Sequence, residues 1–187
     1  MADRDIIPYL LALCALFAAA FLGGILAPPL VARQVTDALK EVGDQYRELA
    51  GGTLFFYILL HNVSASLLLL ASGLLYGVIP VLAAGSNGFV LGVLFREVAA
   101  TTGYAKAALS VVPHGIFEIP ALLFTASYGL WLGIMAFRRV RGREEAPLRV
   151  QLNHAFERYF AVVFPLLVMA AAIETFLLLR QGSGGTP

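Results

Sequence analysis

The sequence predicts an all-α fold, a polytopic transmembrane bundle of about five spans in a single domain. Of its 187 residues, 59% are hydrophobic and only 13% are charged, whereas soluble domains carry about 25% charged residues. Two stretches without any charge, 6–32 and 49–95, exceed the roughly 20 residues that a helix needs to cross a bilayer. With 13 basic and 12 acidic residues, the chain offers no basic face for nucleic acid, and we exclude that class of partner.

The first span is expected at residues 6–26. A cleaved signal peptide is the alternative, but its apolar core is about 7–15 residues long, and this run continues without charge to Ala32. We therefore expect a retained helix. Residues 35–49 follow, with Val35, Leu39, Val42 and Tyr46 at helical intervals among charged residues, which is typical of an amphipathic surface helix.

Residues 49–95 contain no Asp, Glu, Lys or Arg, a run too long for one span and sufficient for two. Pro80, Gly85 and the sequence Ser86-Asn87-Gly88 gather residues that break helices or accept unusual backbone angles. We therefore expect the chain to turn at 78–88. The second span is then 55–79 and the third is 87–103, with Arg96 and Glu97 as a charge pair near its outer end.

The fourth span is expected at 116–137, after a broken or re-entrant segment near Pro113–Pro120. Pro113, Gly115 and Pro120 interrupt the apolar run there, because a proline removes a helical hydrogen bond. An amphipathic stretch at 148–158 leads to the fifth span at 159–179. Residues 181–187 are expected to form a flexible tail.

Four arginines, at positions 138, 139, 141 and 143, directly follow the fourth span. Basic residues beside a span favour the cytoplasmic side of the membrane. We therefore expect a multi-pass protein of the cell membrane whose N-terminus and 138–158 loop are cytoplasmic. Five spans then place the C-terminus and the 35–49 segment outside.

Glycines four residues apart mark three helix faces that a neighbouring backbone can approach closely. One interpretation is packing inside a single subunit, which we favour, and the other is a contact between copies in a homodimer. The pairs are Gly73 with Gly77, Gly88 with Gly92, and Gly129 with Gly133.

Polar groups inside hydrocarbon are costly, so they usually face the interior of a bundle and form a site or a structural network. We predict one intramembrane polar site. His114 and Glu118 are four residues apart and share a face if their segment is helical. The site comprises His114, Glu118, Glu174, Asn62 and Asn87.

Two interpretations of this polar set remain. It could bind a cation, a proton or a small polar ligand, or it could be a hydrogen-bonded network that holds the bundle in register, which we favour. One histidine and two glutamates on separate spans do not define a metal, and no cofactor is indicated. No nucleophile with its base, phosphate-binding loop or metalloprotease helix is present. We therefore expect no enzymatic activity.

Four segments of the sequence resemble the stage II sporulation protein M family over roughly residues 55–176. They are His61-Asn62, Ser86-Asn87-Gly88 with Gly92, the block from Pro113-His114-Gly115 to Glu118-Ile119-Pro120-Ala121, and Ala171-Ala172-Ile173-Glu174-Thr175-Phe176. The block with the two prolines is the most specific. Seven residues match the polar positions of the family's motifs: Asn62, Asn87, Gly88, His114, Gly115, Glu118 and Glu174.

The resemblance implies a helical inner-membrane protein with an inward-facing N-terminus. One bacterial branch of the family acts in engulfment during sporulation, where it resembles a scaffold for cell-wall-degrading partners. We expect a scaffold or assembly protein, in contact with the bilayer and with other membrane or envelope proteins or further copies of itself. The alternative is a small transporter or channel-like protein with its site at His114, Glu118 and Glu174, since discontinuous helices commonly form such sites.

Overall fold

The structure is a computed structural model that describes residues 6–44, 51–143 and 147–183, and within these ranges it is helical apart from short turns. The helices are α1 (Ile7–Ile25), α2 (Pro29–Asp44), α3 (Gly51–Ser72), α4 (Val78–Thr102), α5 (Tyr104–Val140), α6 (Leu148–Arg158), the short π-helix η2 (Tyr159–Val163) and α7 (Phe164–Ser183). The predicted all-α class is confirmed.

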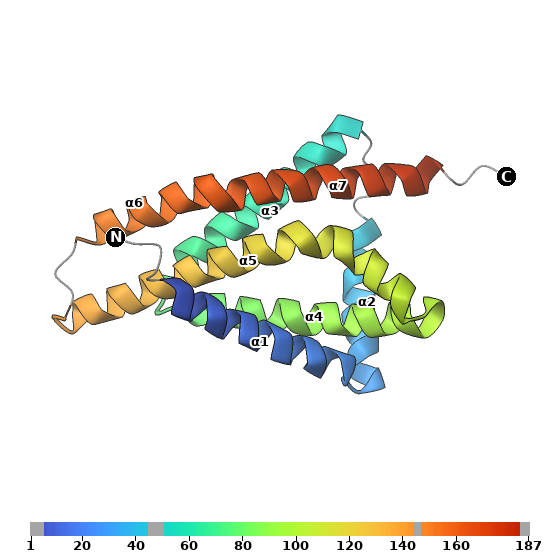
Figure 1. Cartoon of the computed structure of the whole chain (residues 1–187), viewed down its shortest axis with the longest axis horizontal. Helices are drawn as coiled ribbons and strands as arrows, with labels where there is room; N and C mark the ends of the chain where they lie inside the picture. Colours follow the sequence, from blue (N-terminus) through green and yellow to red (C-terminus); the bar gives the residue numbers. More distant parts are fainter. Residues whose placement is uncertain (1–5, 45–50, 144–146, 184–187) are drawn as a thin grey trace.

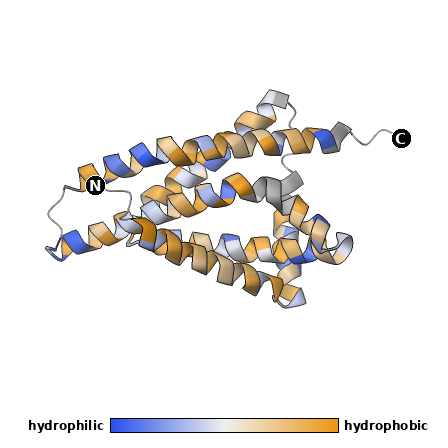
Figure 2. Cartoon of the chain, in the orientation of Figure 1, coloured by the Kyte–Doolittle hydropathy of each residue, from blue (hydrophilic) through white to orange (hydrophobic). Residues whose placement is uncertain are grey.

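Five helical segments of the described chain are long and apolar enough to cross a membrane. Figure 2 shows hydrophobic residues along these helices, while hydrophilic residues gather near the two ends of the bundle. The predicted number of spans agrees with this result. The segments are Ile7–Ile25, Gly52–Ser72, Val78–Thr102, Gly115–Val140 and Leu148–Arg180.

The long helices run side by side, and α2 crosses one end of the bundle at a steep angle to them (Figure 1). The helices α1, α4 and α5 form one group, while α3 packs against both α5 and α7, and the rod that α6, η2 and α7 form together also contacts α5 directly. In Figure 1 the start of α1, the α3–α4 turn, the end of α5 and the start of α6 share one end. The helix α2, the α4–α5 connection and the end of α7 share the other.

The turn between the second and third spans lies at residues 73–77, not at the expected 78–88. Gly77 accepts a positive φ of 73° immediately before α4, a backbone angle that glycine adopts at no steric cost. Pro80 then falls in the first turn of α4, where its missing N–H is not needed. Gly85, Ser86, Asn87 and Gly88 consequently lie inside the helix.

The chain does not break near Pro113–Pro120 as expected. It forms one helix, α5, from Tyr104 to Val140. Both prolines lie inside it. Figure 1 shows the first turns of α5 at an angle to the rest of the helix, as expected where proline interrupts the hydrogen-bond ladder. The membrane span begins only at Gly115. A bent, continuous helix therefore replaces the predicted re-entrant segment.

The two predicted amphipathic segments are helices, with one change of boundary. The segment α6 has the predicted bounds 148–158, whereas α2 begins at Pro29 rather than at residue 35. The end of the predicted 35–49 segment, residues 45–49, lies outside the described residues. The predicted flexible tail at 181–187 starts too early, because α7 continues to Ser183.

The glycine pairs pack helices of this chain against one another. A Cβ atom added at Gly92 would overlap the carbonyl oxygen of Phe21 in α1, and one at Gly88 would overlap that of Phe17. On the other side of the bundle, Gly73 and Gly133 meet backbone atoms of α5 and of the α3–α4 turn in the same way. These contacts support the interpretation of packing inside one subunit.

Arg96 holds the corner between α1 and α2 against α4. Its guanidinium donates to the carbonyl oxygens of Ala27 at 2.5 Å and of Ile25 at 3.4 Å. It also forms the expected ion pair with Glu97 at 3.0 Å. An arginine at this position satisfies carbonyl groups that the end of α1 leaves without helical partners.

Candidate functional site

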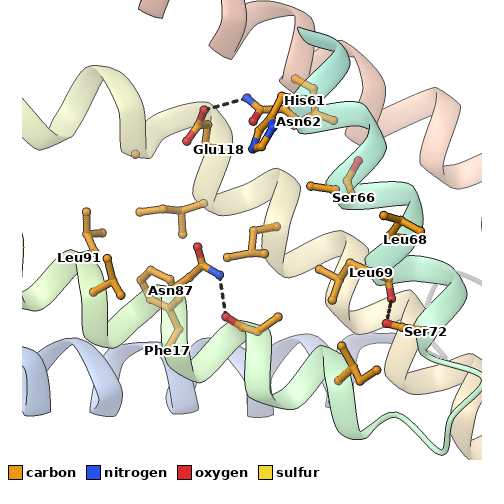
Figure 3. A pocket seen from close by; sticks show the side chains of 18 of the residues that line it. Phe17, His61, Asn62, Ser66, Leu68, Leu69, Ser72, Asn87, Leu91 and Glu118 are labelled. Carbon is orange, nitrogen blue, oxygen red and sulfur yellow. Dashed lines mark hydrogen bonds between the residues drawn. The ribbon is translucent and has the colours of Figure 1, made fainter. Parts of the chain in front are cut away.

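A hydrogen bond between Asn62 and Glu118 joins α3 to α5 within the membrane-spanning part of the chain. The Asn62 Nδ2 group donates to Glu118 Oε1 at 3.1 Å, and both side chains are half-buried. Figure 3 shows the two side chains pointing toward each other from facing helices. Residues with polar groups at membrane depth commonly pair in this way, because an unpaired one is costly in hydrocarbon.

Asn62 and Glu118 line a cavity of about 760 Å³ between α3, α4 and α5. Leucine, isoleucine, valine and alanine make up most of its wall, and α2 contributes Leu39. Figure 3 shows the cavity with α3 on one side and α4 on the other. The polar lining residues are His61, Asn62, Ser66, Ser72, Asn87 and Glu118.

Asn87 lies in the same cavity, on α4, but it does not join the pair. Its Nδ2 group donates to the carbonyl oxygen of Ala83, in its own helix, at 2.8 Å (Figure 3). The hydroxyl of Ser72 likewise donates to Leu69 in its own helix at 2.7 Å. The cavity is therefore polar mainly at His61, Asn62 and Glu118, with Asn87 across from them.

The structure places three members of the predicted polar site in one cavity. Asn62, Glu118 and Asn87 share the cavity, whereas Glu174, half-buried on α7, is not among the described residues that line it. The side chain of His114 lies outside the described residues. A meeting of His114, Glu118 and Glu174 therefore stays a prediction.

One buried polar contact was missed in the sequence. The hydroxyls of Ser66 in α3 and Tyr159 in η2 are 2.7 Å apart, and Tyr159 is only 1% exposed. Ser66 follows Asn62 by four residues, so both lie on one face of α3. That spacing is the only signal the sequence offers, because Tyr159 is nearly a hundred positions away and starts a π-helix that no pattern predicts.

Among the described side chains, no three His, Cys, Asp or Glu residues gather closely enough to hold a metal ion. What the described arrangement offers is a carboxyl group and two amides facing an apolar cavity. Such a set can donate and accept hydrogen bonds with a small polar group inside the bilayer.

Comparison with known proteins gives one family match. A family model described as stage II sporulation protein M matches residues 10–177. An uncharacterized protein of Methanocaldococcus jannaschii is 30% identical over 121 residues, which cover 64% of this chain and 68% of that protein. No solved structure matches.

Proposed function

Because the chain belongs to the stage II sporulation protein M family, we propose that this multi-pass membrane protein is a scaffold that assembles other membrane or envelope proteins. One observation carries the proposal. The helices α1 and α4 meet through backbone contacts at Gly88 and Gly92, and α5 meets the α3–α4 turn in the same way at Gly73 and Gly133. Such contacts leave little freedom for neighbouring helices to shift. A scaffold requires a bundle of fixed shape.

The outer face of α3 is the surface that we expect partners to use. Phe56 and Leu60 are 61% and 63% exposed there, and they lie opposite the cavity-lining residues on the helical wheel. Apolar exposure alone is also what lipid requires, so the exposed fraction does not distinguish lipid from protein. We propose that a protein, rather than lipid, covers this face of α3 in native membranes.

Photo-crosslinking in the native membrane tests this statement. A photoreactive amino acid is placed at Phe56, at Leu60 or, as a matched control on another lipid-exposed face, at Leu22 of α1, which is 60% exposed. We expect Phe56 and Leu60 to form adducts with the same identified protein, and deletion of the scaffold to displace that protein from its site in the membrane. Adducts with lipid alone at all three positions would argue against a scaffold.

A second candidate function is transport of a small cation or polar solute. The specific observation in its favour is the Asn62–Glu118 pair at the wall of a 760 Å³ cavity, since carboxyl groups inside membranes commonly mark ion and proton pathways. Proton and sodium flux into proteoliposomes is the test. We expect flux that Glu118→Gln abolishes in a chain that still folds, and flux no greater than that of empty liposomes rules this function out.

A further inference from the structure

The cavity between α3 and α4 is chemically divided along its length. His61, Asn62 and Glu118 line a part of the cavity that lies farther from the α3–α4 turn than Leu69 and Ser72 (Figure 3). Leu69, Ser72 and Ile79 lie toward the α3–α4 turn, and Ser72 there is already bonded to its own helix. One end of the cavity can thus bind a polar group, whereas the other offers hydrocarbon contacts.

The volume of the cavity suits a small molecule. At about 760 Å³, it lies within the roughly 300–1,000 Å³ of small-molecule sites. From His61 to Ser72 the wall of α3 extends about 16 Å, which suits an extended chain.

The opening of the cavity lies toward lipid rather than toward water. Leu68 and Ile79, which line it, are 71% and 41% exposed, and both helices that flank it are membrane-spanning segments. At the α2 end the cavity is bordered by an amphipathic helix, whose junction with α1 is held by Arg96. A molecule that enters from the bilayer would therefore place its polar end on the side of the cavity that faces α2.

We propose that this cavity binds a single-chain amphiphile, with a hydroxyl or amine head at His61, Asn62 and Glu118 and its hydrocarbon chain along Leu69 and Ile79. A carboxyl group accepts hydrogen bonds from such heads and repels phosphate or carboxylate heads of the same charge. The site is additional to the scaffold role and does not depend on it, because partner proteins would cover the opposite face of α3.

Photo-labelling of the full-length protein in detergent tests the site. Three probes of equal chain length carry a photoreactive group near the chain terminus and end in an amine, a hydroxyl or a carboxylate. We expect the amine and hydroxyl probes to label residues near Leu69, Ser72 and Ile79, and the fatty acid to label them about tenfold less, as for loss of one charge-assisted hydrogen bond.

Two alanines of α3 provide matched variants. Ala65 lines the cavity and Ala71 does not, although both are exposed. We expect Ala65→Phe to reduce labelling about tenfold or more by filling the cavity, and Ala71→Phe to leave it unchanged. If Ala65→Phe does not fold, Ala83→Phe fills the cavity from α4 instead.

The head position is tested separately. Glu118→Gln should lower labelling by the amine about five- to tenfold while the alcohol probe changes less, because only the amine gains a charged partner.

Labelling that is equal in Ala65→Phe and the parent, or that spreads evenly over the outer faces of α1 and α3, overturns the site. Equal preference for the three heads overturns the proposed head group. Neither result bears on the crosslinks expected from Phe56 and Leu60.

Discussion

Asn62 and Glu118 are 56 positions apart in the sequence, yet their hydrogen bond connects two membrane-spanning helices. One turn further along α3, Ser66 contacts Tyr159. These two contacts tie α3 to α5 and to the last span through side chains. The end of α3 also approaches α5 closely, because a Cβ atom at Gly129 would lie 3.3 Å from the carbonyl oxygen of Leu69. At residue scale, polar pairs thus add to close backbone packing of the kind that joins α1 to α4.

Replacing Asn62 by alanine should lower the stability of the bundle by about 1 kcal/mol, since it removes the donor from a half-buried carboxyl group. In a protein of this size that corresponds to a decrease of about 2–4 °C in melting temperature, measured in detergent. Asn87→Ala is the matched control, because Asn87 bonds only within its own helix among the contacts described. An equal decrease in both variants would mean that the link to Glu118 contributes no stability.

At the scale of elements, α4 shows why glycine within a span has two different roles. Gly85 and Gly92 both lie inside this helix, but a Cβ atom at Gly85 would meet only the side chain of Leu16 at 3.9 Å. At Gly92 it would overlap the backbone of Phe21. The sequence shows both residues as helix-weakening glycines, and only the packing of α1 against α4 separates them.

Gly92→Ala should therefore destabilise the protein by about 1–3 kcal/mol, because the helices must separate to admit the methyl group. Gly85→Ala should be neutral or stabilising by up to about 1 kcal/mol, since alanine favours the helix. Thermal unfolding of both variants in detergent measures the difference. If Gly92→Ala unfolds at the temperature of the parent, α1 and α4 are not in close backbone contact.

At the scale of the whole molecule, the arrangement of its ends determines the topology. The end of α5, where arginines occupy positions 138, 139, 141 and 143, and the start of α1 lie at one end of the bundle, and α2 lies at the other (Figure 1). The five spans require these two ends to face opposite sides of a membrane. The density of arginine at 138–143 predicts that its end is cytoplasmic.

Single cysteines at Ala38 and Arg143, in a Cys14→Ala background, should be labelled from opposite sides of the membrane. Both positions are exposed, and Arg143 is preferable to Gly142, whose φ of 66° would strain a cysteine. On intact cells, an impermeant maleimide should react with Ala38→Cys and reach Arg143→Cys only after permeabilisation. The reverse pattern would invert the orientation, and labelling of both from outside would refute five spans.

The sequence by itself determined the class of this protein, the number of its spans and the bounds of the amphipathic segment before η2. These properties follow from local composition, because a helix in a bilayer must be apolar over a fixed length. It could not locate the α3–α4 turn, since Pro80 and Gly85 are compatible with either a turn or a helix. The turn instead lies at Gly77, where a Cβ atom would overlap Leu130 of α5, a contact between distant residues that local sequence does not show.

Only the tertiary structure decided which polar residues share the cavity. Asn62, Asn87 and Glu118 were predicted as one set with His114 and Glu174, but which residues face the cavity depends on how each helix is rotated about its axis and where its neighbours pack. Hydropathy in a span contains little information on that rotation, because nearly every face is apolar. The facing sides are instead selected by close contacts such as those of Gly92 with Phe21 and of Ser66 with Tyr159.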